Sequence, residues 1–163
     1  MKENIRKKTA LIIASLITVM ISTVSIEAAE KIIPSNKIEP KVVSQFIEEA
    51  KKNTNWKTAF VTGEQEQIVF MNVSPATNPN NEIGLEVHPF DQIIFIVEGS
   101  GKAVLNENTT LIKDGDMIFV PRGTAHNFIN SDKEKGLKLI SFYSENDIPK
   151  EAVYKKKSDE PKE

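Results

Sequence analysis

From Trp56 onward the chain consists of short runs rich in β-branched and aromatic residues, separated by turn residues such as Gly63, Gly99 and Gly101. These runs predict β-strands. The predicted strands span residues 57–62, 67–73, 83–88, 92–98, 102–105, 110–113, 116–120, 125–129 and 137–143. Many short strands joined by close turns are typical of an all-β sandwich or small barrel.

One helix is predicted before the strands. Apolar residues recur at helical spacing from Val42 to Ala50, Ser44 is placed to cap the start, and the helix is expected to end near Asn53. The predicted organisation is a linker and short helix over residues 29–53, a barrel over 54–148 and a charged tail over 149–163, frayed from Lys155 onward.

The N-terminus has the three parts of a secretory signal peptide. Lys2, Arg6, Lys7 and Lys8 precede an uncharged apolar stretch over residues 10–24, and Ala28 and Ala29 follow it. Residues 1–28 are therefore expected to be cleaved near Ala28, leaving an exported protein, periplasmic or secreted, without a stable membrane anchor. The alternative is an uncleaved anchor helix, although the apolar stretch is short for a span of about 20 residues.

Composition excludes several kinds of chemistry. The 163 residues include no cysteine, so disulfides, thiolate metal ligands and a cysteine nucleophile are ruled out. The net charge is −2 and the lysines and arginines are scattered. A nucleic-acid partner would require a basic stripe or face, so none is expected.

The strongest motif lies between Gly115 and Asn130. Its five specified positions are Gly115, Pro121, Gly123, His126 and Asn130. Because Gly and Pro make up only about 7% and about 5% of residues, this set arises by chance in roughly one chain in ten thousand or fewer. Pro121 and Gly123 predict a tight turn, after which His126 points from the next strand into the barrel.

A second constellation lies between Gly84 and Gly99. Glu86 and His88 are two residues apart, so they share one face of a strand. Gln92 has the same parity, whereas Asp91 has the opposite parity and is expected to face away. The chain's two histidines, His88 and His126, thus fall in the two motifs.

With these motifs, residues 53–163 resemble a group of small bacterial cupins often labelled mannose-6-phosphate isomerase-like. The other marks are NTNWKTAFVTG at 53–63, EVHPFDQ at 86–92 and LKLISFYS at 137–144. The resemblance implies a double-stranded β-helix, or jelly-roll, with a metal site in its mouth. This chain departs from the pattern, since Glu86 replaces the first histidine, Gln92 replaces a glutamate, and Tyr154 stands where many relatives carry histidine.

The predicted metal ligands are Glu86, His88, Gln92 and His126. Oxygen and nitrogen ligands without sulfur suit a divalent Mn, Fe, Ni or Zn ion. Trp56, Phe60 and Tyr143 are expected to be packing residues. A metal-free barrel, in which Glu86 and Gln92 only form hydrogen bonds, is the alternative.

Three functions remain open from the sequence. One is a metal-dependent enzyme acting on a small molecule, either an oxygenase or a sugar-phosphate isomerase, with catalytic residues unknown. Another is a non-catalytic barrel that binds or senses a small molecule, and the third is a metal-free structural barrel. The fold does not choose among them. Small cupins often pair through exposed strands, so a homodimer is an option.

Overall fold

The computed structural model describes residues 38–161. The predicted signal peptide, residues 1–28, lies outside these residues. The chain divides into two units, 1–41 and 42–163, and the fold described below is that of the second. Within the described range no helix is long and apolar enough to cross a membrane.

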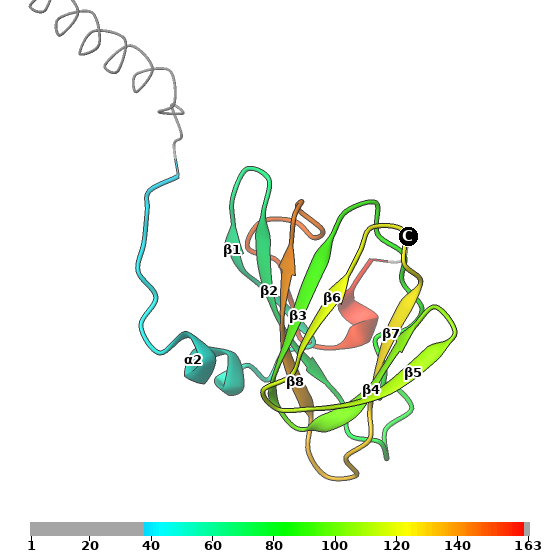
Figure 1. Ribbon diagram of the computed structural model, residues 1–163. Helices are drawn as coiled ribbons and strands as arrows, with labels where there is room; N and C mark the ends of the chain where they lie inside the picture. Colours follow the sequence, from blue (N-terminus) through cyan, green and yellow to red (C-terminus); the bar gives the residue numbers. More distant parts are fainter. Residues whose placement is uncertain (1–37, 162–163) are drawn as a thin grey trace, which may run out of the picture. The chain divides into compact units, whose positions relative to one another are not determined.

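The strands form two antiparallel sheets (Figure 1). The larger sheet has the order β6-β3-β8-β2-β1-β9 and the smaller one the order β5-β4-β7. The bounds are β1 Lys57–Thr62, β2 Gln67–Val73, β3 Gln92–Glu98, β4 Ser100–Leu105, β5 Asn108–Lys113, β6 Met117–Val120, β7 His126–Asn130, β8 Leu137–Tyr143 and β9 Val153–Tyr154. Neighbouring strands are often distant in sequence, as β3 beside β8 and β4 beside β7 show, so the all-β jelly-roll prediction is confirmed.

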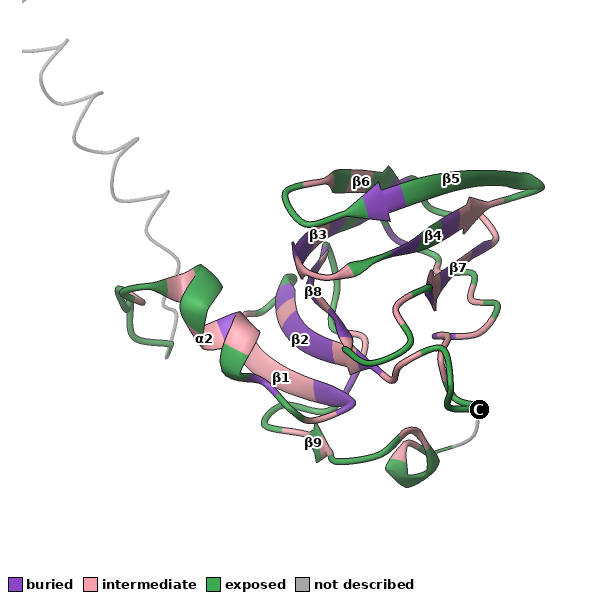
Figure 2. Cartoon of the chain, turned by 90° about the horizontal axis from the view of Figure 1, so that it is seen from below, coloured by how far each residue is buried: buried purple, intermediate pink, exposed green. Residues whose placement is uncertain are grey.

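The core lies between the two sheets, where alternate residues of each strand point inward (Figure 2). In β3, Gln92 and Ile94 are buried while Ile93 between them is exposed. In β7, His126, Phe128 and Asn130 are buried. The same alternation that fills the core therefore turns Gln92 and His126 toward the interior.

Helix α2, Phe46–Lys52, packs against the outer face of the larger sheet and contacts β3 and β8. A second apolar cluster forms there, centred on Ala50, Phe70, Val97 and Ile140. The helix starts later than predicted, and Ser44 is not its cap. Gln45 occupies the cap position with a left-handed φ of 53°, and no side chain caps the helix. The apolar spacing does not reveal this left-handed residue, and Val42, before it, is 94% exposed.

The predicted strand over 83–88 is wrong as a regular strand. This segment makes only two isolated bridges to the region of β7, Glu82 with Ile129 and Glu86 with His126. Gly84 has a φ of +104°, outside the extended conformation, and Pro89 has no backbone N–H to continue a ladder. The segment thus lies beside β7 as an irregular chain.

The prediction of a frayed tail is wrong for the described part of 155–163. Val153 and Tyr154 pair with β1, and a 3₁₀ turn follows at Lys157–Asp159. The Trp56 N–H donates to the carbonyl of Lys155, and the Lys157 ammonium donates to the carbonyl of Glu82. This segment, drawn in red in Figure 1, is packed against the domain.

Candidate metal centre

Glu86 and His126 lie directly opposite each other across an antiparallel bridge. Each backbone N–H donates to the other's carbonyl, both at 2.9 Å. Side chains of residues paired in this way project from the same face. Backbone pairing therefore brings the Glu86 carboxylate near the His126 ring, and the Glu86 Oε2 to His126 Nε2 distance is 3.9 Å.

The orientation of the His126 ring is fixed by a backbone carbonyl. His126 Nδ1 lies 2.8 Å from the carbonyl oxygen of Thr124. Because a carbonyl only accepts hydrogen bonds, Nδ1 carries the proton and Nε2 presents a lone pair. Nε2 is buried and has no hydrogen-bond partner among residues 38–161. A second ring nitrogen bonded in this way is the usual arrangement of metal-binding histidines.

His88 is held by aromatic packing and by a carboxylate. Its ring stacks on Phe90 at a centroid distance of 4.9 Å and meets the Tyr143 ring edge-on at 5.6 Å. Its Nδ1 lies 3.6 Å from Asp147 Oδ1, and its Nε2 lies 3.5 Å from Glu86 Oε2. Nε2 is buried without a hydrogen-bond partner in the described part of the chain.

Ligand atoms of Glu86, His88 and His126 all lie within 4.8 Å of one another. This confirms that two histidines and a glutamate from the two predicted motifs meet at one point. Gln92 is 2% exposed and donates its Nε2 to Ser141 Oγ at 2.7 Å. Its Oε1 has no partner within residues 38–161, so it remains a predicted fourth ligand. Asp91 is exposed, as its parity predicted.

Residues 76–143 match the family model described as a cupin domain. The protein contains a cupin domain. The predicted small cupin type is confirmed, while the mannose-6-phosphate isomerase-like label remains a prediction.

Three relatives of the cupin domain are informative. The chain is 34% identical over 106 residues to an uncharacterised protein of Acanthamoeba polyphaga mimivirus, covering 63% of this chain and 64% of that one. It is 33% identical over 116 residues to the uncharacterised protein YrkC of Bacillus subtilis, covering 67% of this chain and 60% of that one. The chain thus spans less than two thirds of the length of these two proteins. A crystal structure from Bacillus halodurans matches with a TM-score of 0.69 and 28% identity, covering 78% of this chain and 97% of that one.

The charges around the cupin site favour an ionised carboxylate beside one neutral imidazole. Burial raises the pKa of Glu86, but His88 and Lys57 outweigh burial and hold this pKa below its usual value. Burial lowers the pKa of His126. Burial also opposes protonation of His88, yet the carboxylates of Glu86 and Asp147 raise its pKa above the ordinary value.

Sequence reasoning missed Lys57, which lies next to Glu86. Its side chain is only 3% exposed, and its Nζ is 3.5 Å from Glu86 Oε1 and 2.6 Å from Glu160 Oε1. Burial lowers the pKa of Lys57, but these two carboxylates outweigh burial and raise it. A lysine at the start of a strand has no distinctive pattern, and its partner Glu160 lies in the segment predicted to fray.

Asp147 was also missed. It belongs to the loop after β8, where the Oε1 of buried Gln67 accepts the backbone N–H groups of Asp147 and Ile148, both at 3.1 Å. Burial raises the pKa of Asp147. Tyr143 is packed as predicted, and burial raises the pKa of its hydroxyl well above the ordinary value. No sequence motif marks Asp147, because its place depends on the loop.

An open pocket of about 1050 Å³ leads to the centre. Glu86 and His88 line it together with Lys57, Asp147 and Glu160. His126 is 1% exposed and does not line this pocket. Two of the candidate ligand residues therefore line the pocket, while the third, His126, is buried away from it.

The donor set fits a divalent metal ion. A metal would use the lone pair that the Thr124 contact leaves on His126, the unpartnered Nε2 of His88 and the carboxylate of Glu86. Gln92 Oε1 would add a neutral oxygen. The set contains no sulfur, in keeping with the absence of cysteine.

Proposed function

We propose that the cupin domain binds one divalent metal ion through Glu86, His88, Gln92 and His126, and that the ion holds a small molecule at the open pocket. The observation that carries this proposal is the pair of buried, unpartnered Nε2 atoms of His88 and His126 beside one carboxylate. Leaving a buried polar atom unpaired costs about 1–3 kcal/mol, and a metal ion satisfies both nitrogens at once.

The ligand types support Mn, Fe, Ni or Zn rather than a sulfur-seeking ion. The alternative of a metal-free barrel accounts for Glu86, whose charge Lys57 balances, and for His88, which faces Glu86, but it leaves His126 Nε2 without a hydrogen-bond partner among the described residues. A bound ion of this kind supplies Lewis-acid polarisation or an activated water.

The chain's own residues would orient a small molecule in this pocket. Lys57 provides a cation beside Glu86, and Asp147 provides a carboxyl group on the side of His88. Phe90 and Ile148 provide apolar wall. A metal-dependent oxygenase or isomerase fits this arrangement, as does a barrel that binds its ligand without chemistry. Turnover of oxygen or of a sugar phosphate distinguishes the two.

The metal proposal is tested by measuring metal content on full-length protein purified without chelator or nickel resin. Near-stoichiometric metal is expected in the wild type, with strong loss in His88→Ala and Glu86→Gln. Glu82→Gln is the matched control. Glu82 also forms an isolated bridge in this segment, but its carboxylate accepts a hydrogen bond from Asn127 and does not belong to the cluster. Absence of metal after loading with each ion, or equal metal in all variants, would refute the proposal.

Export through residues 1–28 is also proposed, and the order of basic, apolar and small residues supports it. Sequencing of the mature N-terminus from the exported fraction of a bacterial host is expected to give a start near Ala28 or Ala29. A start at Met1 in that fraction would contradict cleavage.

A further inference from the structure

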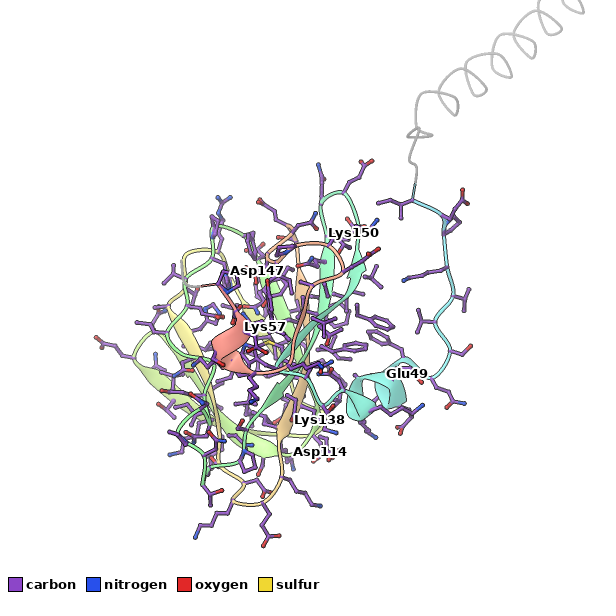
Figure 3. All side chains as sticks on the ribbon, turned by 180° about the vertical axis from the view of Figure 1, so that it is seen from behind. Glu49, Lys57, Asp114, Lys138, Asp147 and Lys150 are labelled. Carbon is purple, nitrogen blue, oxygen red and sulfur yellow. The ribbon has the colours of Figure 1, made fainter. Side chains whose placement is uncertain are left out.

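Lys57 lies at the centre of a network that connects the C-terminal segment to the metal centre. Its Nζ donates to Glu160 Oε1 at 2.6 Å, while the Trp56 indole Nε1 donates to Glu160 Oε2 at 2.9 Å. Figure 3 shows Lys57 beside the C-terminal 3₁₀ turn. Both oxygens of Glu160 are thus engaged, and the donors come from Lys57, the first residue of β1, and from Trp56 just before it.

The network divides the two oxygens of Glu86 between two kinds of partner. Oε1 lies 3.5 Å from the Lys57 ammonium. Oε2 faces the two imidazoles, at 3.5 Å from His88 Nε2 and 3.9 Å from His126 Nε2. The carboxylate therefore points one oxygen at a cation already present in the chain and the other at the candidate ligand nitrogens.

We propose that Lys57 is a positioning residue that holds Oε1 of Glu86, so that Glu86 offers only Oε2 to the metal. The inference rests on the proposed metal site. A carboxylate binds a metal through one oxygen or through both, whereas an imidazole nitrogen makes a single bond. If Glu86 is a ligand, something must fix whether it binds the metal through one oxygen or two. The buried ammonium of Lys57 beside Oε1 can do so.

Binding of the metal through one oxygen of Glu86 affects access to the metal from the pocket. A carboxylate that binds through one oxygen leaves a further coordination position free for a small molecule. Glu86, His88 and Lys57 all line the open pocket, so this position would face the entrance rather than the buried side occupied by His126. Lys57 would therefore preserve access to the metal by restraining one of its ligands.

The test uses the full-length protein loaded with Co(II), because Co(II) absorbs visible light more weakly as its coordination number rises. Lys57→Met removes the ammonium, frees Oε1 and removes a positive charge near the ion. We expect a weaker visible absorption and roughly tenfold tighter Co(II) binding. Lys57→Arg, which keeps the charge and the donor, should retain the wild-type spectrum.

Lys157→Met is the matched control. Lys157 lines the same pocket, but its Nζ donates to the carbonyl of Glu82 rather than approaching Glu86. The Co(II) spectrum should be unchanged in this variant. If Lys57→Met does not fold because Glu160 loses its buried partner, the double variant Lys57→Met with Glu160→Gln removes both charges and carries the same expectation.

An unchanged spectrum and affinity in folded Lys57→Met would overturn the inference, and so would weaker Co(II) binding. Failure of the underlying proposal is distinguishable. In that case the wild type itself would bind no Co(II), or would bind it equally in His126→Ala.

Discussion

Gln92 and Gln67 flank Tyr143 in one row of the larger sheet, but only Gln67 has all its side-chain polar atoms engaged. Both glutamines pair in register with Tyr143, Gln67 from β2 and Gln92 from β3. Gln67 donates to Thr62 and Ile148 and accepts from Asp147 and Ile148. Gln92 donates to Ser141, and its Oε1 has no partner in the described chain. Identical residue types in equivalent positions thus differ in how fully their side chains are hydrogen-bonded.

Gln92→Glu should tighten divalent metal binding, by about tenfold, because it adds a negative charge at the predicted fourth ligand. Ser141 can turn its hydroxyl to donate to the new carboxylate. Titration of Mn(II) or Zn(II) into protein stripped of metal measures the change. Without metal, the variant should be less stable, since a buried carboxylate is costly.

Gln67→Glu is the control for this prediction. It introduces the same charge at a fully buried position, but into the contacts that hold the Asp147 loop. It should lower stability and leave metal affinity within a few-fold of wild type. If both variants change metal affinity equally, or if Gln92→Glu changes nothing, Gln92 is not a ligand.

His126→Ala should abolish bound metal while leaving the β-sheet circular dichroism intact. The lone pair of Nε2 is lost, and no further histidine can replace it, because the sequence has two histidines and the other, His88, is already in the cluster. The cavity left by a ring that is 1% exposed should cost about 2–4 kcal/mol of stability. Metal analysis and urea unfolding check the two effects separately. Stoichiometric metal retained in this variant would contradict the assignment.

Much of this arrangement could be predicted from the sequence because it depends on alternation and on local turns. The bounds of β1, β2, β3 and β8 agree with the predicted runs. The alternation of residues along the strand also correctly predicted that Gln92 is buried and Asp91 exposed. The His126 prediction needed only the turn at Pro121 and Gly123. These features are set within a few residues of the side chain concerned.

The residues that sequence reasoning missed depend on distant contacts. The buried ammonium of Lys57 donates to Glu160, 103 positions away, and the indole of Trp56 donates to the same carboxylate. β9 has only two residues, too few for an alternation to appear. Glu86 reaches His126 through an isolated bridge in a segment broken by Gly84, and not through the regular strand that its spacing predicted.

Asn130, the last position of the strongest motif, should act on stability and not on metal binding. It is fully buried, its Nδ2 lies within 3.0 Å of the carbonyl oxygens of Val73, Ser74 and Lys135, and its Oδ1 accepts from the N–H of Asp132. Asn130→Ala should cost about 3 kcal/mol in urea unfolding, because several buried backbone groups lose their partner. Exposed Asn108→Ala should stay within about 0.5 kcal/mol of wild type. Equal effects would contradict this structural role.

Asp132 should contribute to the acid sensitivity of the fold. Its Oδ1 accepts the backbone N–H groups of Glu134 and Lys135 at 2.8 and 2.9 Å, and these contacts hold its pKa below the ordinary value of 3.8. A carboxyl whose pKa is lowered by folding stabilises the protein above its unfolded pKa and loses that contribution as pH falls through the folded value. Asp132→Asn should therefore show a shallower loss of unfolding free energy below about pH 4 than the wild type. Urea unfolding across acidic pH measures this, with exposed Glu107→Gln as the control. Identical pH profiles for Asp132→Asn and wild type would show that these contacts do not persist in solution.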